Sequence, residues 1–169
     1  MVQSCLFQTI RLFWNPSKIY LLNTLNQSMS KFSIISNDFV DGGEIPKECG
    51  YKHGNEEPHI DFIPGETEPF PWAMIMDDPD AMKAVGKVWV HWLEYGNTDG
   101  DAVIEGKNDF GEIGYGGPAP PDGRHTYVFK LYELDTDLDL KEGFSKQELE
   151  DAIKGHIVAE AKLTGTYAP

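Results

Sequence analysis

The sequence predicts a mainly β domain of the sandwich type, with one helix near its C-terminal end. From Lys31 onward, short apolar runs alternate with turn-forming clusters, as in an all-β sandwich and unlike repeated strand–helix units. The strongest runs are rich in aromatic and β-branched residues. The chain has 169 residues, of which 40% are hydrophobic, so it can bury the core of one domain.

Apolar runs bounded by turn residues mark the expected strands in chain order. They are residues 31–36, 72–78, 87–95, 126–134 and 163–167. A turn at Asp41-Gly42-Gly43 follows the first run. The middle three runs are the strongest, and a loop rich in glycine and proline, residues 111–123, lies before the last of these three.

A helix is expected to begin at Ser145, because Glu148 follows three residues later and completes a capping box. One face carries an apolar residue at every fourth position, namely Leu149, Ile153, Ile157 and Ala161. This face should lie against a sheet. Gly155 within the helix costs about 1 kcal/mol relative to alanine, which indicates a close approach of another segment.

The chain is strongly acidic, with 14 Lys and Arg residues against 28 Asp and Glu residues and a formal net charge of −14. Binding to a nucleic-acid backbone or to an anionic membrane surface depends on basic residues, so neither partner is expected. No apolar run approaches the roughly 20 residues that span a bilayer. An anionic ligand therefore needs a local pocket, because the overall field repels it.

Two cysteines, Cys5 and Cys49, are too few for a disulfide framework or a cysteine-rich zinc site. Free thiols in a reducing compartment are expected, and the cytoplasm is the expected location.

The first 28 residues contain Arg11 and Lys18 but no acidic residue, which sets them apart from the rest of the chain. We expect residues 1–29 to form a poorly ordered extension and residues 30–169 to form the domain. A targeting segment and a start of the functional protein near Met29 are the alternatives.

Strand periodicity decides which side chains of the two histidine-containing strands can meet, because alternate residues share a face. On the first strand one face carries Lys87, Trp89, His91 and Leu93, and the opposite face carries Val88, Val90 and Trp92. On the second strand the shared face carries His125, Tyr127, Phe129 and Leu131. His91 and His125 are therefore expected to lie among aromatic side chains.

Three carboxylates, Asp77, Asp78 and Asp80, surround Pro79 where an apolar strand ends. Taken alone they fit a turn, since aspartate caps its own backbone well. Together with the two histidines and the loop 111–123 they favour a pocket.

Residues 114–119 of that loop formally match the dinucleotide-binding pattern G-x-G-x-x-A. That pattern must open a helix in a strand–helix–strand unit, whereas prolines follow here at once, so a dinucleotide site is not expected. The loop instead offers a rigid wall whose backbone N–H groups could face an oxyanion.

The remaining histidines and acids receive ordinary interpretations. His53 and His59 are expected on the surface, and His156 is expected to pack on the predicted helix. Segment 133–143 alternates acids with leucines and is expected to be a solvated edge or loop. A calcium site at Asp135, Asp137 and Asp139 is not expected, because the glycine and the terminal glutamate of a calcium loop are missing.

Six segments carry a resemblance to a known family. They are DGGEIPKECG (41–50), DDPDA (77–81), WVHW (89–92), GKNDFGEIGYGGPAPPDG (106–123), the run from His125 into YVFKLYELDT, and KGHIVAEAKLTGTY (154–167). In this order they resemble the phosphatidylethanolamine-binding protein (PEBP) family, and more closely its bacterial and archaeal Raf-kinase-inhibitor-like branch, the YbhB/YbcL type. The resemblance covers residues 30–169.

The resemblance implies a sandwich of antiparallel strands with a few peripheral helices and a small cavity that accepts phosphate-like groups. The residues that match the family's binding site are Asp78, Asp80, Trp89, His91, Gly117, Pro118, His125 and Tyr127. It further implies a non-enzymatic protein that needs no cofactor, regulation of a protein partner such as a kinase or a protease, and a homodimer.

The chain departs from the family pattern at three positions. Met82 stands where proline usually follows DPDA, and Ala119 stands where this branch often has cysteine. Thr126 follows the second histidine in place of the usual arginine, with Arg124 on the other side. The ion pair expected between that arginine and one of the aspartates is therefore in question.

Protonation of the histidines is expected to govern the pocket. An aspartate beside a histidine favours its charged form, so two imidazoliums and the loop N–H groups would hold the oxygens of a phosphorylated small molecule or side chain. Affinity would then fall as the pH rises. Three alternatives stay open: a small hydrolase or transferase with Asp78 or His91 as nucleophile, a metal site built from histidine and aspartate, and a fold without a ligand.

Overall fold

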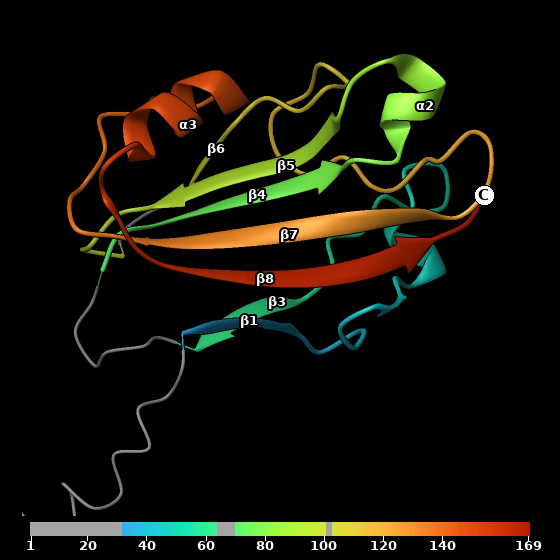
Figure 1. Cartoon of the computed structure of the whole chain (residues 1–169), viewed down its shortest axis with the longest axis horizontal. Coiled ribbons are helices and arrows are strands. Elements are labelled where there is room, and N and C mark those ends of the chain that lie inside the picture. Colours follow the sequence, from blue (N-terminus) through green and yellow to red (C-terminus); the bar gives the residue numbers. More distant parts are fainter. Residues whose placement is uncertain (1–31, 64–69, 101–102) are drawn as a thin grey trace, which may run out of the picture.

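Strands dominate the computed structural model, which describes residues 32–63, 70–100 and 103–169 (Figure 1). The mainly β class predicted from the sequence is confirmed. The strands are β1 (Ser33–Ser36), β2 (Gly43–Glu44), β3 (Ile60–Ile63), β4 (Trp72–Asp78), β5 (Trp89–Gly96), β6 (Val103–Glu105), β7 (His125–Leu134) and β8 (Ile157–Tyr167). The expected extension, residues 1–29, lies outside the described residues.

Two sheets form the sandwich. The larger sheet has the strand order β2-β8-β7-β4-β5-β6, and β1 pairs with β3 in a sheet of two strands. Neighbouring strands are antiparallel, except that β2 runs parallel to β8. The small sheet lies on one side of the large sheet, and the helix α3 (Lys146–Ile153) lies on the other (Figure 1).

Apolar side chains fill the space on both faces of the large sheet, as alternation along its strands requires. The face toward β1 and β3 carries Met74, Met76, Tyr127, Phe129 and Leu131. The face toward α3 carries Ala73 and Ile75, which pack with Leu149 and Ile153 of the helix. Full burial of one such side chain stabilises the fold by about 1.5–3 kcal/mol, so both layers hold the sheet in place.

One extra residue interrupts the pairing of β4 with β5. Met76 pairs with Trp92 whereas Asp77 pairs with Val90, so His91 has no residue opposite it. Such a bulge turns the side chains that follow it onto the other face. Trp92 therefore joins the core under β1 and β3, and Leu93 joins the core under α3. The predicted grouping of Leu93 with His91, and of Trp92 with Val90, is wrong for this reason.

The predicted helix start is confirmed, but the predicted length is wrong. The Ser145 hydroxyl accepts the N–H of Glu148, and the Glu148 carboxylate accepts the N–H of Ser145 at 2.7 Å. The helix ends at Ile153, and Ile157 already begins β8. Gly155 has a φ of 86°, and a Cβ there would meet no atom within 4 Å, so it serves a turn rather than a close approach.

His156 is also placed differently from the prediction. It lies in that turn, is exposed, and its Nδ1 lies 2.8 Å from a carboxylate oxygen of Asp135. His53 and His59 are exposed as predicted. Cys49 is a buried free thiol, and burial raises its pKa to about 11, whereas Cys5 lies outside the described ranges.

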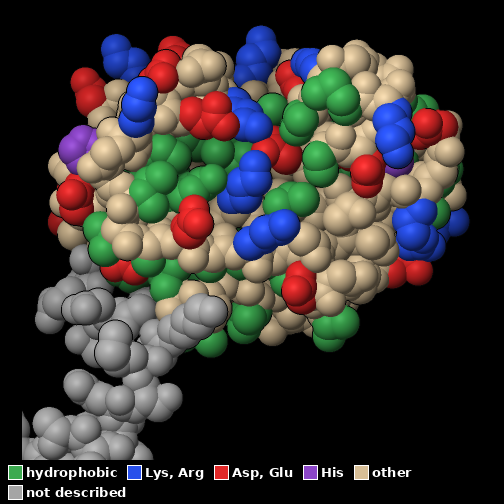
Figure 2. Space-filling model, in the orientation of Figure 1, with side chains coloured by type: hydrophobic (Ala, Val, Ile, Leu, Met, Phe, Trp, Pro, Cys, Tyr) green, Lys and Arg blue, Asp and Glu red, His purple; other side chains and the backbone are tan. Residues whose placement is uncertain are grey.

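Acidic and basic side chains are interspersed over the face of the molecule that Figure 2 shows. That face is therefore not uniformly negative, despite the net charge of −14. Lys130 of β7 and Lys162 of β8 are cross-strand partners on the large sheet. Within the described part of the chain, no helix combines the length and the apolar character needed to cross a membrane.

Candidate functional site

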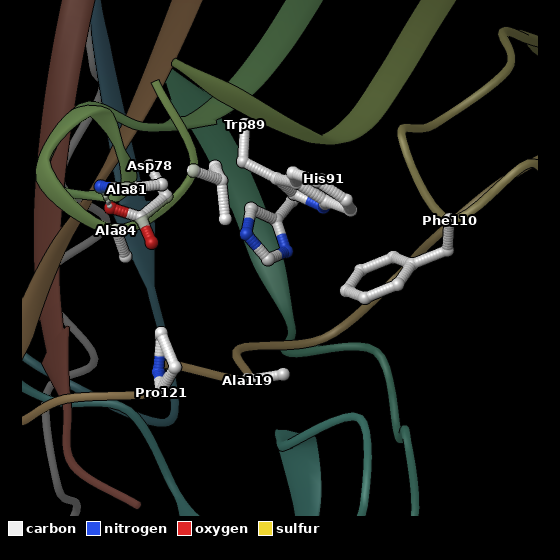
Figure 3. Close-up of a pocket in the computed structure, with 9 residues that line it drawn as sticks. Asp78, Ala81, Ala84, Trp89, His91, Phe110, Ala119 and Pro121 are labelled. Atoms are coloured by element: carbon white, nitrogen blue, oxygen red, sulfur yellow. Dashed lines mark hydrogen bonds between the residues drawn. The ribbon is translucent and has the colours of Figure 1, made fainter. Parts of the chain in front are cut away.

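A cavity of about 200 Å³ lies where β4 ends and β5 begins, beside the short helix α2 (Ala81–Val85) (Figure 3). Its lining comes from the end of β4, α2, the start of β5 and the long loop before β7. The lining residues are Asp78, Ala81, Ala84, Val85, Trp89, His91, Phe110, Ala119 and Pro121. Seven of these side chains are apolar or aromatic, so Asp78 and His91 carry the polar chemistry of the cavity.

The bulge and one loop glycine together hold His91. Its carbonyl accepts the N–H of Gly116 at 2.8 Å, and its Nδ1–H donates to the carbonyl of the same glycine. Because Nδ1 carries that proton, Nε2 of the neutral ring is a lone-pair acceptor. Figure 3 shows the ring projecting into the cavity, with Asp78 on one side and Phe110 on the other.

Burial decides the charge of His91. Desolvation lowers the pKa of this imidazole, and the hydrogen bond to Gly116 and the charge of Asp78 offset it only in part. The ring is therefore neutral near pH 7. The lowered pKa does not favour the imidazolium that the sequence led us to expect at His91, because desolvation of the charged ring outweighs the attraction of Asp78.

Asp78 orients a histidine and accepts the first backbone N–H of α2. Its Oδ1 accepts the N–H of Ala81 at 3.1 Å, and its Oδ2 lies 2.7 Å from Nδ1 of His125. The side chain of the preceding residue, Asp77, lies on the opposite face of the sheet, where its carboxylate pairs with Lys130 and Lys146. The two adjacent carboxylates thus belong to different sites, and Asp78 is the one at the cavity.

An aromatic wall supports the cavity next to His91. Phe110 stacks on Tyr51, with ring centroids 4.0 Å apart and an angle of 5° between the ring planes. Phe110 also contacts Trp89 and His91 edge to face, at 5.3 and 5.6 Å between centroids. The edge of Tyr127 lies against His91 on another side, at 5.1 Å. Stacking of this kind fixes the ring positions that define the shape of the cavity.

The eight residues expected from the family resemblance divide into three groups. Asp78, Trp89 and His91 line the cavity. His125 and Tyr127 lie directly behind these residues, through the contacts with Asp78 and His91. Asp80, Gly117 and Pro118 bind other parts of the chain.

The hydrogen bonds of this third group are internal. Asp80 accepts the N–H of Thr126 at 2.9 Å, so a backbone donor stands where the family resemblance placed an arginine, and Arg124 pairs with Glu44 instead. The N–H of Gly117 donates to Oδ1 of Asn55 at 2.7 Å. Pro118 has no N–H, and its carbonyl accepts the N–H of Tyr51. These contacts hold the loop in place, and neither Gly117 nor Pro118 has a free N–H to offer to a ligand.

Sequence reasoning did not identify most of the apolar lining. Ala81, Ala84 and Val85 belong to α2, a helix that was not predicted, and small apolar residues carry no chemical signal of their own. Phe110 could have been found from its place in the matched segment 106–123. Met82, which replaces the usual proline, is half exposed on α2 and does not line the cavity.

The cavity lining offers few residues that could act as a catalytic nucleophile or as a metal ligand. Serine, threonine, cysteine and lysine are absent from the nine lining residues, so a nucleophile would have to be Asp78 or His91. Among the residues of known placement, no three His, Cys, Asp or Glu side chains are grouped as ligands for a metal ion.

Tyr127 carries an unsatisfied polar atom. The side chain is fully buried, and among the described residues its hydroxyl makes no hydrogen bond of ordinary geometry, although the backbone N–H of Ala119 acts on it weakly. Burial raises the pKa of this phenol, so it stays protonated. Tyr127→Phe should therefore increase the free energy of unfolding by about 1 kcal/mol, because it removes a desolvated group without changing the packing. Urea unfolding of the two proteins measures this difference, and a loss of stability of similar size would contradict it.

The sequence of this chain is similar to that of known proteins over most of its length. Residues 35–168 match the family described as phosphatidylethanolamine-binding protein. A UPF0098 protein of Methanothermobacter thermautotrophicus is 42% identical over 146 residues, which cover 76% of this chain and 93% of that protein. A UPF0098 protein of Chlamydia muridarum is 37% identical over 147 residues, which cover 79% and 97%.

Solved structures with the same fold include two bacterial proteins and one inhibitor of a proteinase. A PEBP homologue of Chlamydia trachomatis has a TM-score of 0.74 and 33% identity, covering 81% of this chain and 97% of its own. E. coli YbcL, a member of the mammalian PEBP family, has a TM-score of 0.70 and 26% identity, covering 82% and 98%. Carboxypeptidase Y inhibitor, solved with its cognate proteinase, shares the fold at a TM-score of 0.51 and 18% identity, covering 89% and 91%.

Proposed function

The chain belongs to the phosphatidylethanolamine-binding protein family, in its UPF0098/YbcL-type bacterial and archaeal branch, and from this premise we propose that it is a non-enzymatic binding protein for phosphoryl-type anions. The ligand class is a phosphate monoester group, on a small molecule or on a side chain. The site is the cavity between α2 and the start of β5. The absence of a hydroxyl or thiol nucleophile from its lining favours binding over covalent hydrolysis.

The position of His91 carries this proposal. Its Nδ1 is already used by Gly116, so only Nε2 remains for a ligand in the cavity. Nε2 accepts a hydrogen bond while the ring is neutral, and it donates one once the ring takes up a proton. A bound oxyanion stabilises that protonated form, and the apolar lining strengthens the attraction because little water screens it.

In this proposal His91 takes up its proton together with the anion, and His125 does not contact the ligand. Both ring nitrogens of His125 lie against carboxylates, so this residue has no donor left for a ligand. His91 starts with a lowered pKa and would end with a raised pKa when the anion binds. Between these two values each anion brings one proton with it. Affinity should therefore fall by about tenfold for each unit by which the pH rises.

Calorimetric titration with inorganic sulfate tests the proposal. Sulfate is a tetrahedral dianion throughout the range from pH 5.5 to 8, so a change in affinity over this range comes from the protein. We expect tighter binding at the lower pH, and uptake of about one proton when buffers of different ionisation enthalpy are compared. His91→Gln keeps a side chain of similar size that cannot be protonated, and it should abolish this pH dependence. His156→Gln removes an exposed histidine in the turn before β8, outside the cavity lining, and should behave as the unmodified chain does.

Either of two results would overturn the proposal. One is a sulfate affinity that does not change between pH 5.5 and 8. The other is binding by His91→Gln that matches binding by the unmodified chain at every pH. Turnover of a phosphate ester by the unmodified chain, lost in His91→Gln, would establish the hydrolase alternative instead.

A further inference from the structure

His125 joins two carboxylates, one on each side of its ring. Its Nδ1 lies 2.7 Å from Oδ2 of Asp78, and its Nε2 lies 2.8 Å from Oδ1 of Asp122. A neutral imidazole has only one N–H, so both contacts are hydrogen bonds only when the ring carries a proton on each nitrogen. The arrangement therefore requires the imidazolium form.

The environment of His125 supports that form. Burial by itself lowers the pKa of this imidazole, but the hydrogen bonds to Asp78 and Asp122 outweigh it and raise the pKa above its ordinary value. His125 thus differs from His91, which is buried without a carboxylate bonded to its ring. One site contains one histidine that favours the charged form and one that favours the neutral form.

The two carboxylates differ in their exposure to water. The side chain of Asp78 is 4% exposed and that of Asp122 is 56% exposed. When His125 loses one proton, a single N–H remains for two acceptors. Asp78 keeps it, because an unpaired buried carboxylate is costly, whereas Asp122 can be hydrated at once. Deprotonation therefore breaks the bond to Asp122.

Asp122 immediately follows the part of the loop that lines the cavity. Ala119 and Pro121 contribute to the lining, and Pro120 lies between them. None of these three residues has a polar side chain, and the two prolines have no N–H to donate. The bond from Asp122 to His125 thus ties this segment, which we term the 119–121 wall, to the start of β7.

We propose that Asp122 is a positioning residue for the binding site, and that its bond to protonated His125 holds the 119–121 wall against the cavity and releases it when His125 loses a proton. Asp122 itself touches no ligand in this scheme. The consequence for ligand binding rests on the proposed function, whereas the movement of the wall does not.

Other charged and titratable groups surround His125. Asp80, at the start of α2, accepts the N–H of Thr126. Tyr167 is the cross-strand partner of His125 on β8, and burial raises the pKa of its phenol, so it stays neutral through the range of interest. His53 is bonded to that phenol, and the adjacent Arg124 pairs with Glu44. None of these groups replaces Asp122 as the partner of Nε2.

Proton NMR of the His125 ring, followed against pH, tests the tie directly and without a ligand. Asp122→Ala should lower the pKa of His125 by about one unit, because it removes one of two carboxylates. In the unmodified chain, the methyl resonance of Ala119 should shift with pH and give the same midpoint as His125, because the wall moves when the bond to Asp122 breaks. In Asp122→Ala the Ala119 resonance should not follow the His125 titration. Asp139→Ala, which removes an exposed carboxylate elsewhere, should change neither quantity.

Sulfate binding compares Asp122→Asn with Asp122→Ala. Both variants remove the same charge, but only asparagine can still accept a hydrogen bond from Nε2–H. Sulfate should therefore bind to Asp122→Ala about tenfold more weakly than to Asp122→Asn at pH 6. An unchanged pKa of His125 in Asp122→Ala, or an Ala119 resonance that does not follow the His125 midpoint in the unmodified chain, would overturn the inference even if sulfate binds. Absence of sulfate binding to every protein, with both NMR results as expected, would reject the proposed function and leave the pH-dependent tie standing.

Discussion

Gly117→Ala is expected to reduce the free energy of unfolding by about 3 kcal/mol, because the new side chain would collide with backbone. A Cβ at this position would lie 2.0 Å from the carbonyl oxygen of Cys49 and 2.7 Å from the nitrogen of Tyr51. Neither atom can rotate away, since both belong to the chain that passes behind the loop. The substitution would force apart the two segments that meet at Gly117 and would strain its hydrogen bond to Asn55.

Urea unfolding measures this loss, with Gly42→Ala as the matched control. Gly42 also lies in a turn, at a φ of 75°, but a Cβ there would meet nothing within 4 Å. Its replacement should cost about 1 kcal/mol, from the backbone conformation alone. Equal losses in the two variants would mean that the close contact with Cys49 contributes nothing beyond the ordinary requirement for glycine.

Asp78→Ala is expected to cost about 3 kcal/mol at pH 6, because it leaves the buried imidazolium of His125 without its buried partner. The same substitution removes the acceptor for the N–H of Ala81 at the start of α2. Asp122→Ala is the matched control, since it removes the other carboxylate on the same ring. Asp122 is largely exposed, so its loss should cost about 1 kcal/mol, well below the cost of removing Asp78.

The pH dependence of the Asp78→Ala effect has a definite sign. The pKa of His125 is raised in the folded protein, so its contribution to stability is fully present below the ordinary histidine value of about 6.5. This contribution is lost as the pH rises through the raised folded-state value. The difference between the unmodified chain and Asp78→Ala should therefore be larger at pH 6 than at pH 9. A difference that stays constant over this range would show that the charge on His125 does not contribute.

The strand framework could be predicted because it depends on local patterns. β4 has the predicted bounds, and β5 and β7 agree to within two residues at each end, since aromatic and β-branched residues mark them clearly. The very short strands β2 and β6 and the four-residue β3 were not predicted, because their pairing depends on partners distant in the chain. The start of α3 was predictable from its capping box, whereas its end depends on the positive φ of Gly155, which composition alone does not reveal.

The site was predictable only in part. Three of the eight residues named from the family resemblance, Asp78, Trp89 and His91, are among the nine that line the cavity. The use of the loop amides was not predictable, because their acceptors come from elsewhere: Asn55 is 62 residues from Gly117 in the chain. The opposite protonation of His91 and His125 also depends on burial and on which ring nitrogen meets which acceptor. These are properties of the folded environment rather than of residue type.

The bulge at His91 has a consequence for anyone who transplants this site into another protein. Up to His91, odd-numbered residues of β5 face the cavity side, and after it Trp92 faces that side. If the sheet of the receiving protein has regular pairing, it can contain the same histidine and tryptophan residues and still direct one of the two side chains to the wrong face. A successful transfer must therefore include the one-residue bulge at His91 and the backbone of Gly116 that is hydrogen-bonded to it, in addition to the binding side chains.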